Sequence, residues 1–412
     1  MKQTEIGLIP DDWEVKNINK ECTIKARIGW QGLKSTEYLD YGNYILITGT
    51  DFNNGFINWK SCSYVTKWRF NQDKNIQIKQ GDVLVTKDGT IGKIAFLGSI
   101  PMQGTLNSGV FVVRPKNNEK IDSVFLSLIF KSLWFDSFLE QITSGSTIVH
   151  LYQKDFVKFD FPLPPLPEQQ RIAKALSDVD ALISTTEKLI QKKKNIKQGT
   201  MQELLTGKKR LPGFAKSNNT KMTELGEIPE DWEVMSLGEI STIIMGQSPN
   251  SDCYNIQKGM VLIQGNADIS NRKTICRFYT THITKTARKG DVIFTVRAPV
   301  GNVAKATFDC CLGRGVCAIQ SISDFLYYYL ISIEDSWSKT STGSTFDSIN
   351  SDTLASTLII QPYSKEEQTA IANVLSSMDK EIETLNTKLE KYRNLKTAMM
   401  QQLLTGKIRL LK

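Results

Sequence analysis

The longest hydrophobic pattern in the chain follows helical spacing near its C-terminal end. From about Lys365 to Leu404, apolar residues recur at alternating steps of four and three positions, and Lys396 interrupts them. The apolar positions are Ile371, Leu375, Met378, Ile382, Leu385, Leu389, Tyr392, Met399 and Leu403. This spacing predicts a long helix with a coiled-coil seam over about four heptads.

A second long helix is predicted from the proline-rich start PLPPLPEQQ to about Leu205. The apolar positions of its seam are Ile172, Leu176, Val179, Ile183 and Ile190. Polar residues occupy later seam positions, namely Thr186, Lys193 and Lys197. A parallel apolar line at Leu182, Leu189 and Ile196 predicts that the stripe drifts around this helix.

The two long helices are expected to pack on each other. Neither helix can bury its whole stripe against one small domain, so a second helix is the economical partner. Gly207 and Gly406 follow the two helices and are predicted to cap their C-terminal ends.

Short β-type segments precede each long helix. They are rich in Val, Ile, Phe and Thr and are bounded by Gly, Asp and Asn, a composition that predicts strands. They span residues 44–52, 82–87, 91–98, 109–115, 291–296 and 315–320. A short helix is predicted after each set, at 124–139 and 324–337. Each set with its helix is therefore predicted to be an α+β domain of roughly 150 residues.

The chain contains two copies of one module. TEIGLIPDDWEV (4–15) matches TELGEIPEDWEV (223–234), QGDVLVTKDGTIGKIA (80–95) matches KGDVIFTVRAPVGNVA (289–304), and MQELLTGKKRL (201–211) matches MQQLLTGKIRL (400–410). The offset between copies falls from 219 at the first pair to 199 at the last, so the second copy is about twenty residues shorter.

The segment IPDDWEVK (9–16) resembles the PD…ExK motif of metal-dependent nucleases. In the second copy Lys16 becomes Met235 and Asp11 becomes Glu230, whereas the apolar residues and the proline persist. Its two parts are also only two residues apart, which is too close for neighbouring strands. The segment is therefore predicted to be a structural element that opens each copy, and not a catalytic site.

The composition gives a mild basic excess. A net charge of +8 and a pI near 8.9 suit a polyanionic partner. Seven cysteines without a CxxC pair predict free buried thiols, and two distant histidines predict no metal site. No signal peptide or apolar run of membrane-spanning length is evident, so a cytoplasmic location is expected. The lysine-rich segment KLIQKKKNIKQ (188–198) is either a DNA-binding stripe or a solvated helix face.

These features together resemble the specificity subunit of a Type I restriction–modification system. The motifs are PLPPLPEQQRIAKAL, the repeated LLTGK, the repeated IPxDWE and the two-copy layout, although the second helix starts from the proline-poor IIQPYSKEEQ. The resemblance implies an α+β protein with two target recognition domains, joined by two long antiparallel helices that form a coiled coil. The implied division is 1–164 (first domain), 165–210 (central helix), 211–222 (linker), 223–363 (second domain) and 364–412 (C-terminal helix).

The resemblance also implies partners. Each domain reads one half of a bipartite, asymmetric target in double-stranded DNA. The helices dock two methyltransferase subunits, through which restriction subunits join, and they set the gap between the half-sites. No catalytic residue, metal or cofactor is expected in this chain.

The loops between the strands are the candidate DNA-binding segments. The frame repeats while the tips differ: residues 87–90 (KDGT) correspond to 296–299 (VRAP). The polar, glycine-bearing loops 30–38, 143–147, 246–254 and 341–345 suit close approach to a sugar-phosphate backbone. The candidate DNA-binding residues are Lys34, Ser35, Lys87, Thr90, Lys93, Ser144, Ser146, Thr147, Gln247, Ser248, Arg297, Ser344 and Thr345.

Three other functions stay open from the sequence. A methyltransferase or nuclease acting alone is disfavoured, because the chain lacks an NPPF- or DPPY-type tetrapeptide and a glycine-rich cofactor loop after a strand. A coiled-coil scaffold that binds no DNA is disfavoured by the basic excess and by the divergent loop tips. The specificity subunit of a Type IIB-like enzyme would have the same sequence features.

Overall fold

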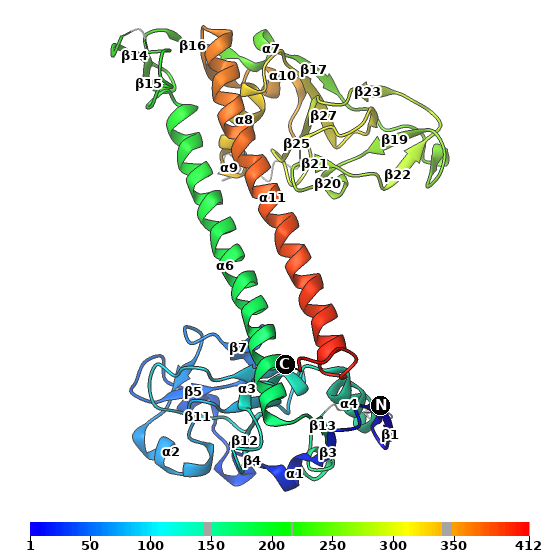
Figure 1. Ribbon diagram of the computed structural model, residues 1–412. Helices are drawn as coiled ribbons and strands as arrows, with labels where there is room; N and C mark the ends of the chain where they lie inside the picture. Colours follow the sequence, from blue (N-terminus) through cyan, green and yellow to red (C-terminus); the bar gives the residue numbers. More distant parts are fainter. Residues whose placement is uncertain (144–149, 216, 340–347, 412) are drawn as a thin grey trace. The chain divides into compact units, whose positions relative to one another are not determined.

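The computed structural model describes residues 1–143, 150–215, 217–339 and 348–411. They form two compact units, Met1–Glu187 with Lys388–Lys412, and Lys188–Thr387. Each unit holds one globular domain, the beginning of one long helix and the end of the other (Figure 1). The boundaries between the units therefore cross both long helices.

The domain of unit 1 is built on two small sheets. The first has the strand order β10-β9-β12-β4, with β4 (Cys22–Ala26), β9 (Val83–Thr86), β10 (Ile94–Phe96) and β12 (Val110–Pro115) all antiparallel. The second has the order β11-β5-β8, with β5 (Ile45–Ile47) parallel to β11 (Gly104–Leu106) and antiparallel to β8 (Ser63–Tyr64). The apolar side chains of these strands fill the core of the domain.

Shorter elements complete unit 1. The strand pairs are β1 (Lys2–Thr4) with β2 (Gly7–Ile9), β3 (Glu14–Asn17) with β13 (Asp160–Leu163), and β6 (Phe52–Asn53) with β7 (Phe56–Ile57). The short helices are α1 (Ile18–Glu21), α2 (Lys67–Asn71), α3 (Ser123–Ile129), α4 (Leu133–Thr143) and α5 (Gln153–Phe156).

The helix predicted at 124–139 is broken into α3 and α4. The hydroxyl of Ser132 donates to the Ile129 carbonyl, and the Ser132 carbonyl accepts from the N–H groups of Phe135 and Asp136. Serine at such a corner ends one helix and begins the next. The break lets Phe130 and Phe135 meet edge to face, with their ring centroids 5.0 Å apart in the aromatic core.

Unit 2 repeats this plan. Its six-stranded sheet has the order β17-β27-β24-β25-β21-β20, and its five-stranded sheet has the order β18-β22-β19-β26-β23. The strands are β17 (Thr242–Met245), β18 (Tyr254–Asn255), β19 (Met260–Ile263), β20 (Ile269–Ser270), β21 (Lys273–Thr274), β22 (Phe278–Thr280), β23 (Lys285–Ala287), β24 (Val292–Thr295), β25 (Val303–Lys305), β26 (Cys310–Leu312) and β27 (Val316–Gln320). The parallel pair β19 with β26 matches β5 with β11, which supports the two-copy prediction.

The remaining elements of unit 2 also have counterparts in unit 1. The strand pairs are β14 (Thr220–Thr223) with β15 (Gly226–Pro229), and β16 (Trp232–Ser236) with β28 (Leu358–Pro362). The helices are α7 (Leu237–Ile240), α8 (Phe325–Ser332), α9 (Glu334–Lys339) and α10 (Ser351–Ala355). The helix predicted at 324–337 is thus split, as its counterpart is in unit 1.

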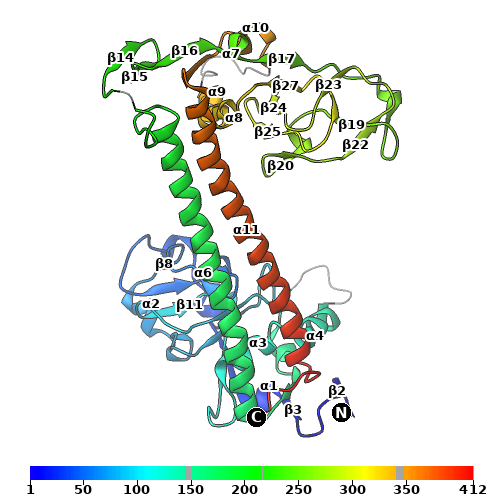
Figure 2. The same cartoon turned by 45° about the horizontal axis from the view of Figure 1, so that its top comes forward.

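The long helices are α6 (Leu166–Leu204) and α11 (Lys365–Leu403). Gly207 and Gly406 follow them with φ angles of 72° and 68°. This left-handed conformation is the one that glycine adopts at a helix end, and it confirms both predicted caps. In Figures 1 and 2, α4 lies beside the C-terminal part of α11, where the Trp134 indole donates to the Leu404 carbonyl at 3.2 Å.

The two helices are antiparallel within each unit. In unit 1, Asp180 pairs with Lys396 at 2.6 Å and Glu187 pairs with Arg393 at 2.8 Å. In unit 2, Lys193 pairs with Glu381 and Lys197 pairs with Asp379, both at 2.6 Å. Residue numbers rise along α6 as they fall along α11. The bridges Asp180–Lys396 and Asp379–Lys197 occupy corresponding positions of the two copies.

The predicted drift of the α6 stripe is wrong. Thr186 is buried and Lys193 and Lys197 are half-buried in the seam, whereas Leu182 and Leu189 are 46% and 39% exposed. A lysine can hold its aliphatic stem in such a seam while its ammonium reaches a carboxylate at the edge. The carboxylates of Glu381 and Asp379 supply that partner, so the seam keeps its register.

The IPxDWE motif of each domain closes on the end of a long helix. In unit 1, the Arg409 guanidinium contacts the carboxylates of Asp12 and Glu168 at 2.6–2.8 Å. It also lies over the Trp13 ring, 5.6 Å from the centroid. The Trp13 indole donates to Glu168 at 3.0 Å. The hydrogen bonds from Arg409 hold the pKa of Asp12 below its ordinary value.

Unit 2 builds the same cluster at the other ends of the two long helices. Arg210 contacts Asp231 and Glu367 at 2.6–2.9 Å and lies over the Trp232 ring at 5.6 Å. A β-carbon at Gly207 would lie 2.6 Å from the Pro229 side chain, so the glycine permits this close approach. We call these two clusters the arginine clamps. The IPxDWE motif is therefore a packing and ion-pairing element, as predicted.

We expect Arg409→Met to destabilise unit 1 by about 3 kcal/mol, because the Glu168 carboxylate, which is 1% exposed, would lose its buried cation. Urea unfolding followed by circular dichroism measures this change. Arg393→Met, which removes an exposed ion pair on α11, is the control and should cost less than about 1 kcal/mol. Equal losses for the two variants would show that the clamp is not a stabilising cluster.

Candidate nucleic-acid interface

A cleft of about 660 Å³ opens among the loops of unit 2. It is formed by the loop after β17, the segment after β19, the tip between β24 and β25, and the turn between β26 and β27. Its lining residues are Ser248, Pro249, Asn250, Ser251, Tyr254, Gln264, Gly265, Asn266, Arg297, Ala298, Arg314 and Gly315.

Glycines bring these loops together. A β-carbon at Gly246 would collide with the carbonyl of Gly313, and one at Gly315 would collide with the carbonyl of Gln264. The Ser248 hydroxyl accepts a hydrogen bond from the backbone N–H of Arg314 at 3.1 Å. Close backbone approach thus fixes three loops and leaves longer side chains to point outward.

The cleft is basic. Arg297 and Arg314 are both exposed, and the described residues that line the cleft include no aspartate or glutamate. Neither arginine forms an ion pair with a residue that the structure describes. A guanidinium presents a planar fork of donors that fits a guanine edge or a phosphate. The cleft is therefore suited to contact with nucleic acid.

The corresponding tip of unit 1 has a carboxylate in place of the arginine. Asp88 stands where unit 2 has Arg297, and its carboxylate contacts the imidazole of His150, whose ring lies 4.3 Å from that of Tyr152. Beside it, the Lys87 ammonium lies 5.3 Å from the Phe111 ring centroid.

The backbone frame behind the two tips is the same. The hydroxyl of Thr86 donates to the Thr90 carbonyl at 2.6 Å, and that of Thr295 donates to the Pro299 carbonyl at 2.8 Å. One frame therefore presents different chemistry in each copy.

Two stretches of the chain, residues 10–198 and 229–391, match the family described as the Type I restriction modification DNA specificity domain. Together they cover most of the chain. The chain belongs to this family.

Relatives of this specificity subunit match nearly the whole chain. The putative type I restriction enzyme MjaX specificity subunit of Methanocaldococcus jannaschii is 33% identical, over 99% of this chain and 96% of its own. The MjaVIII specificity subunit of the same organism is 30% identical, over 97% and 94%. The solved S subunit of a Type I restriction–modification system from M. genitalium shares the fold, with a TM-score of 0.62 at 14% identity over 98% of each chain.

The structure brings part of the predicted DNA-binding set together in the specificity subunit. Ser248 and Arg297 line the unit 2 cleft, and Gln247 is exposed next to it. In unit 1, three predicted residues lie exposed on two loops, Lys34 and Ser35 on one and Thr90 on the other, and Lys87 is half-buried. Lys93 lies apart, in a cavity that also contains residues of α6 and α11. Five predicted residues fall outside the described residues: Ser144, Ser146, Thr147, Ser344 and Thr345.

Arg314, Gln264 and Asn266 were missed by the sequence reasoning. A usable signal existed for Arg314. The turn between β26 and β27 has the sequence GRG (313–315), and its counterpart in unit 1 is NSG (107–109). This is the same pattern of a kept glycine with a divergent tip that identified Arg297. Gln264 and Asn266 carry no such signal, because they reach the cleft through the course of the chain after β19.

Other chemistry finds little support in the described part of the chain. It contains no group of three or more His, Cys, Asp or Glu side chains that could hold a metal ion. The seven cysteines are free, and burial raises the pKa of Cys310 and Cys317 to about 12, so these thiols stay protonated near neutral pH. No helix in the same residues is both long and apolar enough to cross a membrane.

We expect Arg314→Ala to weaken DNA binding by the specificity subunit. If Arg314 reads a base, discrimination at one position should fall by about 1–3 kcal/mol. If it contacts a phosphate, all sequences should weaken alike and the salt slope should fall by about one. Fluorescence anisotropy with labelled duplexes at several salt concentrations separates the two. Arg288→Ala, an exposed arginine outside the cleft, is the control; equal effects of both variants would argue against the cleft.

Proposed function

We propose that this specificity subunit recognises a bipartite, asymmetric DNA target and directs methyltransferase and restriction subunits to it. Residues 1–164 and 223–363 are proposed as the two target recognition domains, each reading one half-site. Residues 165–210 and 364–412 would supply the long helices, with 211–222 as a linker. The observation that carries this proposal is the repeated frame with Asp88 at one tip and Arg297 at the other.

The charge reversal supports two different half-sites. An arginine in an open cleft favours acceptor-rich edges such as guanine N7 and O6, whereas a carboxylate favours an amino donor such as cytosine N4. Asp88 and Arg297 extend from corresponding hairpins of the two units, β9–β10 and β24–β25. Two copies that read the same half-site would need the same charge at this tip. The target is therefore proposed to be asymmetric.

The subunit itself is proposed to catalyse no reaction. The charged residues of IPDDWEVK that resemble a nuclease motif have structural partners, since Glu14 pairs with Lys16 at 2.6 Å and Asp11 pairs with the N-terminal ammonium at 2.9 Å. A nuclease carboxylate must instead face a metal ion and its water. The role of the helices in setting the gap between half-sites stays a prediction.

The function can be tested by co-expressing the subunit with its methyltransferase partner and mapping methylated bases across a genome. We expect a bipartite, asymmetric motif. Arg297→Ala with Arg314→Ala should alter one half of the motif, and Asp88→Ala should alter the other, because the residues belong to different domains. The purified subunit alone, given S-adenosylmethionine, ATP and magnesium, is the control and should neither methylate nor cleave DNA. A continuous motif, or a change in both halves from one variant, would contradict the proposal.

A stripe of exposed apolar residues on α6 is the proposed docking surface for a methyltransferase subunit. Leu182, Leu189 and Ile196 recur every seven positions and are 46%, 39% and 43% exposed. Residues seven apart lie on one side of a helix, and such a seam accepts another helix. The corresponding residues of α11 are Glu381, Lys388 and Leu395, so α6 carries the stronger apolar surface. The occupant we propose is a helix of the methyltransferase subunit.

We expect Leu189→Lys to reduce the amount of methyltransferase subunit that co-purifies with the specificity subunit, because a charge would enter the apolar contact. Size-exclusion chromatography of the co-expressed proteins measures the stoichiometry. Gln191→Lys, an exposed position on a different side of α6, is the control and should leave assembly intact. Unchanged assembly of the Leu189 variant would place the docking surface elsewhere.

A further inference from the structure

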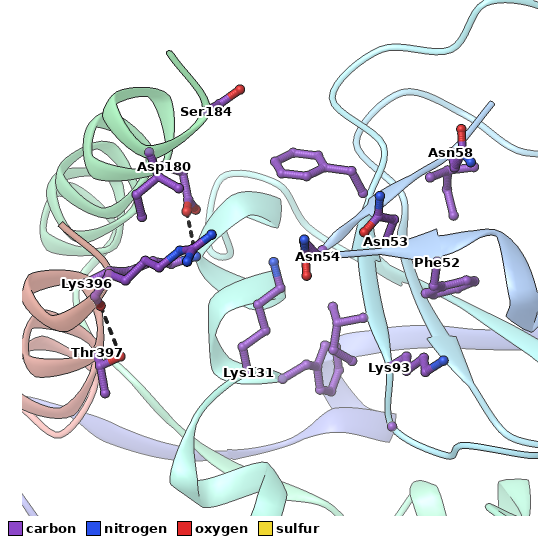
Figure 3. A pocket seen from close by; sticks show the side chains of 18 of the residues that line it. Phe52, Asn53, Asn54, Asn58, Lys93, Lys131, Asp180, Ser184, Lys396 and Thr397 are labelled. Atoms are coloured by element: carbon purple, nitrogen blue, oxygen red, sulfur yellow. Dashed lines mark hydrogen bonds and ion pairs between the residues drawn. The ribbon is translucent and has the colours of Figure 1, made fainter. Parts of the chain in front are cut away.

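A cavity of about 1130 Å³ in unit 1 lies between the globular domain and the two long helices (Figure 3). Its walls are the β6–β7 turn, the corner between α3 and α4, and the facing residues of α6 and α11. Lys131 stands at that corner, and Figure 3 shows its side chain reaching toward Asn54. None of the predicted interface loops except that of Lys93 contributes to this cavity.

The β6–β7 turn is shaped to receive the Lys131 ammonium. Asn54 and Gly55 have φ angles of 49° and 90°, the left-handed pair that a tight two-residue hairpin requires. A β-carbon at Gly55 would collide with the Lys131 ammonium and lie 3.2 Å from its Cε. The N–H of Phe96 donates to the Gly55 carbonyl at 3.0 Å and fixes the turn. Glycine therefore makes room for a cation at this place.

Lys131 has no anionic partner among the residues that the structure describes. Four of the neighbouring charges are already paired, Lys396 with Asp180 at 2.6 Å and Arg393 with Glu187 at 2.8 Å, and the Asp136 carboxylate also lines the cavity without pairing with Lys131. Burial, with the nearby charge of Lys396, lowers the pKa of Lys131 to about 8. A half-buried ammonium without a counterion is costly, and a bound anion would relieve that cost.

The corresponding cavity of unit 2 shows how the same place is neutralised internally. The Arg272 carbonyl accepts from the Lys305 N–H at 2.9 Å, as the Gly55 carbonyl accepts from Phe96, so Arg272 is the counterpart of Gly55. The guanidinium of Arg272 bonds to Glu334 and to the Val303 carbonyl. Unit 2 thus supplies both the cation and its counterion from its own residues.

The helix corner differs in the complementary way. The hydroxyls of Ser132 and Ser332 each donate to the carbonyl three residues earlier, at 2.6 Å, which marks the corner in both units. By this alignment Ile331 is the counterpart of Lys131. Unit 1 keeps a cation in the cavity, moved from the turn to the helix corner, but among the described residues no carboxylate pairs with it as Glu334 pairs with Arg272.

We propose that the unit 1 cavity binds a phosphate group, with the Lys131 ammonium as its principal ligand. The side chains of Asn53 and Asn54 line the cavity and make no hydrogen bond with any described residue, so their amides are available as further donors. Lys93, exposed at the rim, adds positive charge. The phosphate comes either from a DNA backbone, in which case the inference extends the proposed function, or from a free phosphate.

The first test observes the Lys131 ammonium directly in the unmodified subunit. With lysine labelled at Cε, NMR should show one residue that titrates near pH 8, and inorganic phosphate should raise that pKa. Chloride at equal ionic strength is the control and should not. Asp180, Asp136, Glu187, Lys93, Lys396 and Arg393 also face the cavity, so the signal is assigned with Lys131→Met. Phosphate binding should weaken as the pH rises through 8 to 9, because the Lys131 ammonium loses its proton. A Lys131 signal that phosphate leaves unmoved would overturn the proposal.

Variants identify the source of the phosphate. Lys131→Met should lower affinity for inorganic phosphate about tenfold or more, because one charge-assisted hydrogen bond is lost. Arg272→Met, in the neutralised cavity of unit 2, is the matched control and should not change it. If the source is DNA, Lys131→Met should also weaken all duplexes alike and lower the salt slope by about one. If the source is free phosphate, duplex binding should be unchanged.

The proposed function is tested separately from this inference. Lys131→Met should leave the methylated motif the same, since the cavity does not read bases. A missing or continuous methylated motif in the unmodified subunit would contradict the proposed function without bearing on phosphate binding. Phosphate binding that is equal in the parent and in Lys131→Met would overturn the site even if the motif is as expected.

Discussion

The rest of the structure depends on one interaction, the closure of each IPxDWE motif by an arginine from the end of a long helix. Arg409 joins Asp12, Glu168 and Trp13, and Arg210 joins Asp231, Glu367 and Trp232. In each clamp the guanidinium is shared by a carboxylate of the motif and by a carboxylate of the helix that starts there. A single guanidinium therefore holds together three segments that are far apart in sequence. Its hydrogen bonds offset the free-energy cost of partly burying each carboxylate.

This closure exchanges segments between the two sequence copies. The helix that begins at the end of the first domain finishes in the clamp of the second, and the reverse holds for α11. A unit is thus complete only with the tail of the other copy's helix. The antiparallel pairing follows, because Asp180–Lys396 and Asp379–Lys197 can form together only when the helices run in opposite directions. Sequence modules and structural units therefore have different boundaries.

Much of this fold was predictable, and the failures have physical causes. The repeat, the strands, both helix caps and the α11 seam follow from local spacing and glycine position. The break at Ser132 and the seam lysines of α6 do not, because each depends on partners distant in sequence. Phe130 and Phe135 on either side of the break pack against Phe156 and Phe159, and Lys193 and Lys197 pair with Glu381 and Asp379. Of the candidate site, Arg297 was found from a divergent tip and Ser248 from a polar, glycine-bearing loop. Gln264 was not predicted, because it reaches the cleft through the course of the loop after β19. The repeat pattern of the sequence does not show that course.

Comparison of the copies separates positions that close the frame from positions that face open cavities. Clamp arginines, caps and the Lys–Asp bridges are the same in both units, since each satisfies a buried or constrained group that every copy must satisfy. A clear difference lies where side chains face solvent, at the tips, with Asp88 against Arg297. A substitution there leaves no buried group unpaired, so charge can reverse at little cost in stability. The same frame can therefore carry two recognition surfaces that differ in the charge of one tip side chain.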